Sequence, residues 1–309
     1  MGKSDTGRIR GTILASITAL LVLSGCSDEV TVTYGDGTAS GDALTILVGD
    51  EGYRDVLEHV SAHGLADGVE IELVDATDDA NRQLAEGHAD LVYFQTQPAF
   101  LQDRATNSLD TLSVVSEVNV APYALYSAKW SGIEETDDWV NAGLVEDRVT
   151  GTNLPHGATV ALADTVTGFA RGLYLLQESN LITLDREFGG LAARDLAVSE
   201  ANILESQRHL SIRRLDLANF AADAYRNYDA VVLDPRTAAS IGLIPERDAL
   251  KVEPGPNNPY ARVLVAPSRL AGDPRVSALG RALEGEEVAD YLEQKYRGAY
   301  VSVHVPRDK

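Results

Sequence analysis

The sequence contains a single cysteine, Cys26, among 309 residues. One cysteine excludes an intramolecular disulfide, so the folded chain must be stabilised by its core alone. Positive charge is also scarce, with 26 Lys and Arg residues against 47 Asp and Glu residues and a formal net charge of −21. An acidic surface repels phosphate groups, which makes nucleic acid and anionic lipid surfaces poor partners.

Motifs of several enzyme classes are missing from the chain. There is no Gly-x-Ser-x-Gly elbow, no Gly-x-x-x-x-Gly-Lys phosphate loop and no dinucleotide fingerprint. His59 and His63 lie four residues apart in a predicted helix, a spacing that suits zinc, but no Glu follows His59 as a metalloprotease requires. We interpret the pair as part of an exposed helical face and expect no catalysis, metal site or cofactor.

Long apolar runs are lacking as well. The longest lies near the start of the chain, at 12–23, and is mainly apolar. Three basic residues precede it, and small residues then lead to Cys26. A membrane-spanning helix needs about 20 apolar residues, so this run is too short for a comfortable span. Its order of basic, apolar and small residues is typical of a signal peptide, which we predict over residues 1–25.

The four residues Leu23-Ser24-Gly25-Cys26 resemble the lipobox of bacterial lipoproteins. That resemblance implies cleavage before Cys26, attachment of lipid to its sulfur and anchoring at the extracytoplasmic face of the cell membrane. The alternative is an ordinary secretory signal with an incidental cysteine. The polar, glycine-rich stretch at 26–43 is then predicted to be a lipidated flexible tether.

The remainder of the chain is longer than one core usually serves, so two lobes are expected. Apolar runs alternate with helical patterns, which favours βαβ units and the α/β class, with a mainly parallel sheet flanked by helices in each lobe. The predicted strands are 44–48, 69–74, 89–94, 158–162, 214–217 and 229–233, and the predicted helices are 53–63, 81–86, 164–179, 276–283 and 286–296.

One short pattern occurs twice, as Pro122-Tyr123 and Pro259-Tyr260, each followed by a short apolar strand. Two extended segments that join two lobes are what a hinge requires, since a few residues there absorb the rotation of closure. The alternative is two unrelated edge strands that begin with proline. The hinge interpretation predicts a first lobe of residues 44–125 plus 264–309 and a second lobe of residues 126–263.

Four segments of the chain resemble the NlpA family, the methionine-binding lipoproteins of ABC importers. They are Leu84 to Pro98, Leu125 to Lys129, Gly157 to Leu184, and a set of short pieces from Asp229 to Gly298 that includes Glu253 and Pro259-Tyr260. The resemblance implies a two-lobed periplasmic-binding-protein fold of type II with two hinge crossings. It also implies an amino acid held between the lobes and delivered to an ABC permease and its ATPase.

The same resemblance implies a role for Arg171, which matches the arginine with which the family grips the carboxylate of its ligand. A guanidinium offers a planar fork of donors that suits a carboxylate. The alternative for Arg171 is a surface residue paired with Asp164 or Glu178.

Other positions of the expected ligand-binding site depart from the family. Thr96 stands in place of histidine, and Asp164 and Gly168 stand in place of two asparagines. Asp234 and Arg236 stand in place of two more. Arg236 could add an anion clamp; alternatively, Asp234 and Arg236 neutralise each other or meet Asp164 across the cleft. The site residues are therefore predicted to be Arg171, Asp164, Gly168, Phe94, Thr96, Asp234 and Arg236, with Phe94 on the apolar wall.

These departures lead to the hypothesis that the ligand is an amino acid or small carboxylate other than methionine, with a smaller apolar tail or an acidic one. The alternative function is a surface adhesin or a degenerate paralogue without a transport ligand. The insertion at 134–155, which we interpret as a solvated loop, would then be its interaction surface.

Overall fold

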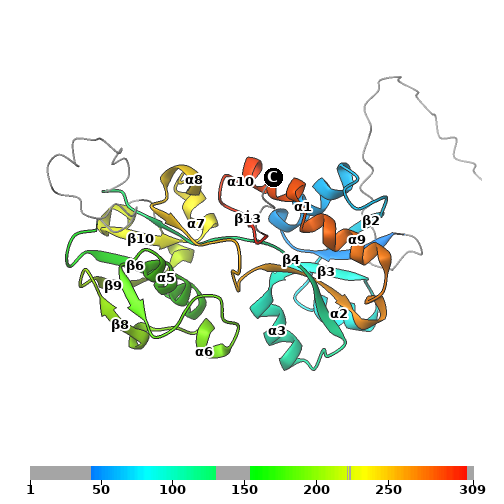
Figure 1. Ribbon diagram of the computed structural model, residues 1–309, viewed down its shortest axis with the longest axis horizontal. Helices are drawn as coiled ribbons and strands as arrows, with labels where there is room; N and C mark the ends of the chain where they lie inside the picture. Colours follow the sequence, from blue (N-terminus) through cyan, green and yellow to red (C-terminus); the bar gives the residue numbers. More distant parts are fainter. Residues whose placement is uncertain (1–42, 130–153, 221, 223, 305–309) are drawn as a thin grey trace, which may run out of the picture. The chain divides into compact units, whose positions relative to one another are not determined.

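The protein is described by a computed structural model, which describes residues 43–129, 154–220, 222 and 224–304. The signal peptide, Cys26, almost all of the tether and nearly all of the insertion therefore lie outside the described residues. The described residues fall in one compact unit that contains two main sheets (Figure 1).

The first sheet has the strand order β13-β4-β12-β3-β1-β2. Its strands are β1 Leu44–Val48, β2 Ile71–Asp75, β3 Leu91–Thr96, β4 Leu112–Val120, β12 Arg262–Pro267 and β13 Val301–Ser302. The helices of this part of the chain are α1 Glu51–Ala62, α2 Ala80–Glu86, α3 Gln97–Thr106, α9 Pro274–Leu283 and α10 Glu286–Tyr296, with a 3₁₀ turn at Ser268–Leu270.

The second sheet has the order β11-β5-β10-β6-β9, and β7 and β8 form a separate pair. The strands are β5 Ala124–Tyr126, β6 Thr159–Ala163, β7 Ile182–Leu184, β8 Ile203–Ser206, β9 Ser211–Leu215, β10 Ala230–Leu233 and β11 Lys251–Val252. The helices are α5 Val166–Glu178, α6 Ala193–Leu196, α7 Pro235–Ser240 and α8 Pro245–Asp248, with 3₁₀ turns at Glu200–Asn202, Leu217–Asn219 and Ala224–Asn227.

The predicted α/β class with two sheets and flanking helices is confirmed, but the expectation of mainly parallel sheets is wrong. Pairing is parallel in β2-β1-β3 and in β9-β6-β10. The strands added beyond them, β12, β4 and β13 in one sheet and β5 and β11 in the other, pair antiparallel. Each sheet therefore has a parallel part built from βα units and an antiparallel part built from strands that join or follow the crossings.

Sheet membership also corrects the predicted lobe boundaries. β5 at 124–126 belongs wholly to the second sheet and β12 at 262–267 wholly to the first. The boundaries expected after residues 125 and 263 therefore fall inside these two strands. The connections between the sheets are residues 121–123 and 253–261, on which both Pro-Tyr pairs lie.

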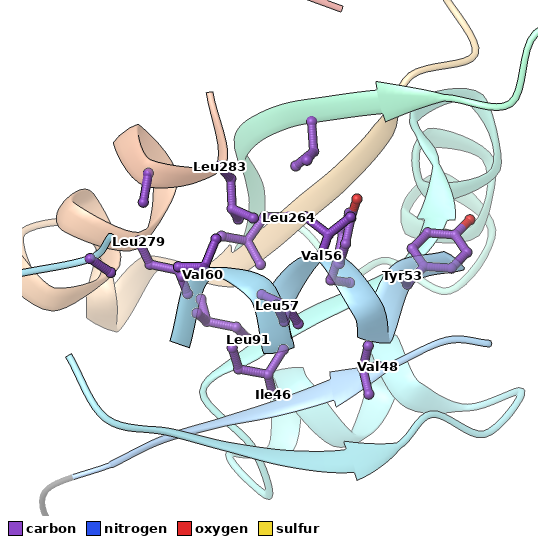
Figure 2. Packing of buried hydrophobic residues seen from close by; sticks show 14 of the residues in the cluster. Ile46, Val48, Tyr53, Val56, Leu57, Val60, Leu91, Leu264, Leu279 and Leu283 are labelled. Carbon is purple, nitrogen blue, oxygen red and sulfur yellow. The ribbon is translucent and has the colours of Figure 1, made fainter. Parts of the chain in front are cut away.

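The core of the first sheet explains why β1 is almost entirely apolar. Ile46 and Val48 face α1, whereas Leu47 faces the opposite side with residues of α2 and α3. Figure 2 shows α1 lying over the sheet, with Val56 and Leu57 among the side chains packed against it. Because both faces of β1 are covered, the strand does not alternate apolar with polar residues, and its one polar side chain, Thr45, is buried and donates a hydrogen bond to Glu72.

The core of the second sheet is built around α5. Phe169, Leu173 and Leu176, which the helical pattern places on one face, are all buried there. Thr165 begins the helix, since its side chain accepts a hydrogen bond from the backbone nitrogen of Gly168. Asn180 follows the helix with φ of 54°, which confirms the predicted stop.

Most predicted elements are found close to their expected bounds, and β1 and α10 have the bounds predicted. The strand predicted at 214–217 is displaced, because β9 spans Ser211–Leu215. Helix α3 and strand β4 were not predicted. Within the described part of the chain, no helix combines the length and the apolar character that crossing a membrane would need.

The packing of α5 on β6 predicts a specific cost for a small change. A Cβ atom added at Gly172 would lie 2.8 Å from Cδ2 of Leu162, so Gly172→Ala should lower the free energy of unfolding by about 1–3 kcal/mol. Gly272→Ala is the matched control, because nothing lies within 4 Å of its added Cβ. Urea unfolding measures both; equal effects would show that close approach of α5 to β6 is not required.

Candidate functional site

The two connections between the sheets run beside each other. The backbone nitrogen of Glu253 donates to the carbonyl oxygen of Tyr123 over 2.9 Å. The carboxylate of Glu253 in turn accepts from the backbone nitrogen of Tyr123, also over 2.9 Å. The prediction that the two Pro-Tyr segments are the crossings is thus confirmed, and they are joined at this point.

Arg171 projects from α5 into the junction of the crossings. Its Nε donates to Oε1 of Glu253 over 3.0 Å, and its Nη2 contacts Oε2 of the same carboxylate. Nη2 also donates to the carbonyl oxygen of Ala121 over 2.9 Å. The guanidinium carbon lies 4.1 Å from the ring centre of Tyr123 and 4.6 Å from that of Tyr260. One side chain of the second sheet thereby contacts both crossings.

Burial makes this pair electrostatically strong. Arg171 is 7% exposed and Glu253 is 3% exposed. Burial acts to lower the pKa of Arg171, but the charge and hydrogen bonds of Glu253 raise it above its ordinary value, so the guanidinium stays protonated. Burial likewise raises the pKa of the Tyr123 and Tyr260 hydroxyls, so both rings stay neutral.

The surface-residue alternative for Arg171 is wrong, since the side chain is buried and its partner is Glu253 instead of Asp164 or Glu178. Glu253 was named in the family resemblance, but no role was predicted for it. The hydrogen bonds use Nε and Nη2 of Arg171, and within the described residues none is found for Nη1. The guanidinium can therefore donate to a further acceptor without leaving Glu253.

Two predicted site residues lie at the carboxyl ends of neighbouring parallel strands. Asp164 follows β6 and is exposed, and Asp234 follows β10. Asp234 begins α7, because its carboxylate accepts from the backbone nitrogen of Thr237 over 3.0 Å and from its hydroxyl over 2.6 Å. Both acids therefore lie at one edge of the second sheet, not across a cleft from each other.

Gly168 lies between this edge and the crossings. A Cβ atom at Gly168 would be 2.6 Å from Cβ of Ala163 and 3.2 Å from the hydroxyl of Tyr123. The position therefore has no room for the asparagine side chain that the family places there. The absence of a side chain at Gly168 instead leaves room for the hydroxyl of Tyr123.

The remaining predicted residues lie at the matching edge of the first sheet or point to it. Phe94 and Thr96 are on β3, and Phe94 is partly buried against Gly49 at the end of β1. The Nη2 atom of Arg236 lies 3.8 Å from Oδ2 of Asp50, which precedes α1. The alternative in which Arg236 pairs with Asp234 or Asp164 is therefore wrong, and a role of Arg236 as an anion clamp stays a prediction.

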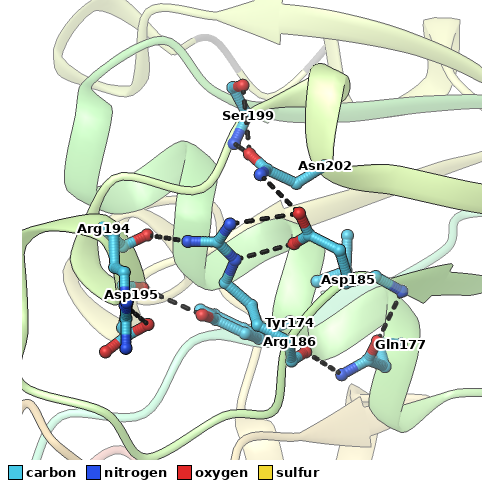
Figure 3. A network of polar contacts seen from close by, with 9 residues as sticks. Tyr174, Gln177, Asp185, Arg186, Arg194, Asp195, Ser199 and Asn202 are labelled. Atoms are coloured by element: carbon cyan, nitrogen blue, oxygen red, sulfur yellow. Dashed lines mark hydrogen bonds and ion pairs between the residues drawn. The ribbon is translucent and has the colours of Figure 1, made fainter.

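A polar network holds the helix that carries Arg171 (Figure 3). The hydroxyl of Tyr174 donates to the carbonyl oxygen of Asp195 over 2.9 Å, and the Gln177 amide donates to that of Arg186 over 3.1 Å. Asp185 accepts from Nε of Arg186 over 2.7 Å and from Asn202 over 3.2 Å. The segment that follows α5 is thus hydrogen-bonded to α5, and these bonds restrict rotation of the helix about its axis.

The two histidines singled out in the sequence pack against each other and against an aromatic ring. His59 stacks on the ring of Tyr291 with centres 3.9 Å apart, and His63 lies 4.2 Å from His59. Within the part of the chain that the structure describes, no group of three or more His, Cys, Asp or Glu residues could hold a metal ion.

The sequence profile of the family described as NlpA lipoprotein matches residues 44–141 and 149–304. The methionine-binding lipoprotein MetQ of Bacillus subtilis (strain 168) is 28% identical over 225 residues, which cover 72% of this chain and 73% of that protein. The membrane lipoprotein TpN32 of Treponema pallidum (strain Nichols) is 26% identical over 303 residues, covering 97% and 98%.

Solved structures agree with the fold. The crystal structure of lipoprotein Tp32 from Treponema pallidum has a TM-score of 0.56 at 25% identity and covers 85% of this chain and 100% of that chain. An ABC transporter periplasmic substrate-binding protein from Coxiella burnetii has a TM-score of 0.57 at 22% identity, covering 84% and 99%.

The buried pair predicts a large stability effect. Glu253→Gln should lower the free energy of unfolding by about 3–5 kcal/mol, because it leaves the buried charge of Arg171 without its partner. Glu246→Gln is the matched control, since Glu246 forms an exposed pair with Arg297 over 2.8 Å and should cost about 0–1 kcal/mol. Similar losses in urea unfolding for both variants would contradict the account.

Proposed function

Because the chain belongs to the NlpA lipoprotein family, we propose that it is the substrate-binding lipoprotein of an ABC importer. Its ligand is an amino acid or small carboxylate, captured between the two sheets and passed to a permease driven by a cytoplasmic ATPase. The proposal includes no catalytic step.

The observation that carries the proposal is the position of Arg171. A protonated guanidinium lies at the junction of the crossings, held by Glu253 through Nε and Nη2. Nη1 is the donor that we assign to the carboxylate of the ligand. A cation placed by a rigid partner loses little side-chain entropy when it binds, which favours affinity.

The acids at the edge of the second sheet favour a ligand that carries an ammonium group. Asp164 and Asp234 follow neighbouring strands, and an exposed carboxylate such as that of Asp164 attracts a cation. Phe94 and Thr96 at the edge of the first sheet are proposed to contact the rest of the ligand.

Methionine is named in relatives of this chain, but the site argues for a different ligand here. Gly168 offers no side chain to the ligand, and Asp234 uses its carboxylate to begin α7. A site that lacks a partner for a polar ligand atom leaves that atom unpaired, which lowers affinity. Weak methionine binding is therefore part of the proposal.

A thermal-shift screen of the purified protein against amino acids and small carboxylates tests this function. A ligand at 100 times its dissociation constant should stabilise the protein by about 2.7 kcal/mol. Arg171→Lys should remove most of that shift, because lysine keeps the charge beside Glu253 but lacks Nη1. Arg297→Lys, an exposed arginine paired with Glu246, is the control and should keep the shift.

Two results would contradict the proposal, one from calorimetry and one from this screen. Tight methionine binding in calorimetry would refute the altered specificity. No shift with any compound would favour the surface adhesin or degenerate paralogue.

Anchoring by Cys26 is proposed on the lipobox resemblance and on the family. Two or three acyl chains, each contributing about 0.8 kcal/mol per buried methylene, would hold the protein on a membrane. Cys26→Ser should move the protein from the membrane fraction to the soluble fraction after export. Retention of the variant in the membrane fraction would show that another segment anchors it.

A further inference from the structure

Arg262 differs from every other buried charged residue in the described part of the chain. The buried charged residues are Asp90, Arg171, Glu253 and Arg262. Asp90 pairs with Arg269 over 3.2 Å, and Arg171 pairs with Glu253. Arg262, only 8% exposed, has no ion pair with a described acid, and its buried Nη1 has no hydrogen-bond partner.

The neighbours of Arg262 are aromatic and uncharged. Its guanidinium carbon lies 3.8 Å from the ring centre of Tyr53 and 4.3 Å from that of Tyr300. Burial raises the pKa of Tyr53, so its hydroxyl stays protonated and cannot neutralise the cation. Burial also raises the pKa of the Tyr93 hydroxyl, which therefore stays protonated.

A buried cation without an opposite charge is costly, and a chain retains one where something else supplies the charge. Ring faces attract a guanidinium, but they do not fill the vacant donor at Nη1. An anion at Nη1 would supply both the charge and the acceptor.

The position of Arg262 points to the ligand as the source of such an anion. Arg262 begins β12 opposite Thr96, which ends β3, so it lies at the edge of the first sheet where the ligand is proposed to bind. A Cβ atom at Gly52, in the first turn of α1, would lie 2.9 Å from Nη1. The amino end of a twelve-residue helix, which favours negative charge, therefore lies beside the unpaired donor.

Arg262 and Arg171 both lie beside the crossing at 253–261. Tyr260, whose ring stacks on Arg171, precedes Arg262 by only two residues. Arg171 is already neutralised by Glu253, whereas Arg262 is not. Asp50 near Tyr53 does not replace the missing anion, since it pairs with Arg236.

We propose that Arg262 binds an acidic group of the ligand, so that the ligand is an acidic amino acid or a small dicarboxylate. This inference rests on the proposed function and narrows its ligand class. Nη1 is buried, and a Cβ atom added at Gly52 would lie 2.9 Å from it and 2.8 Å from the hydroxyl of Tyr300. The inference therefore includes a movement of the partly exposed Tyr300 side chain that opens Nη1 to the ligand.

Calorimetry with matched acidic and neutral ligands tests the inference. The probes are L-glutamate against L-glutamine and L-aspartate against L-asparagine, with succinate as the dicarboxylate and sodium chloride at equal ionic strength as the inorganic anion. In the wild type, one acidic amino acid should bind at least about tenfold more tightly than its neutral counterpart, since a hydrogen bond to a charged group is at stake.

Arg262→Gln should bring that ratio to about one while binding of the neutral ligand remains. Its melting temperature without ligand should be unchanged or higher, because an unpaired buried charge has been removed. Arg262→Lys is the second variant, keeps the cation and should retain part of the acidic preference. A melting temperature that falls in Arg262→Gln and recovers in Arg262→Lys, with the ratio unaltered in both, would show a structural role and overturn the inference.

The remaining outcomes separate the two proposals. Neutral ligands that bind, with an acidic-to-neutral ratio that Arg262→Gln leaves unchanged, would overturn this inference and leave the importer function intact. Sodium chloride that stabilises as much as succinate, in an Arg262-dependent manner, would show a site for any small anion and also overturn it. No binding of any probe or other carboxylate would overturn both proposals.

Discussion

The buried pair of Arg171 and Glu253 is the interaction on which the arrangement of the crossings depends. Arg171 comes from α5 of the second sheet, Glu253 begins one crossing, and the carbonyl oxygen of Ala121 belongs to the other. The rings of Tyr123 and Tyr260 cover the guanidinium from these same crossings. Because the pair is buried, loss of either partner leaves a charge that water cannot solvate, so the three segments are constrained together.

The charges on the two sides of the proposed site are distributed unequally. The second sheet places Asp164 and Asp234 at one edge, and its buried cation, Arg171, is paired with Glu253. The first sheet brings a buried cation, Arg262, with no acid beside it. A ligand that carries both an ammonium group and more than one acid would match this distribution of charge.

Much of the fold could be predicted from local patterns. β1 is an apolar run ended by Gly49-Asp50, and α5 shows its buried face at helical spacing. β4 was missed because its run is interrupted by polar residues, two of which, Ser116 and Asn119, are nevertheless buried in the middle of the sheet. α3 was missed because Phe100 is its single buried residue, which leaves no apolar stripe to detect.

The site was less predictable than the fold. The family resemblance singled out Arg171, but its partner Glu253 is 82 residues away and is brought to it by the return of the chain through the second sheet. One alternative paired Arg236 with Asp234 or Asp164 of the second lobe, whereas its partner is Asp50, which precedes α1. Arg262 carried no signal at all, since only the burial of its surroundings distinguishes it from a surface arginine.

The measurement that tests the central claim most directly is a crystal structure of the protein with its bound ligand. The account predicts a ligand carboxylate on Nη1 of Arg171, with Glu253 still bound to Nε and Nη2 and both crossings still joined between Tyr123 and Glu253. A ligand bound away from the crossings, or a Glu253 carboxylate displaced from Arg171, would contradict it.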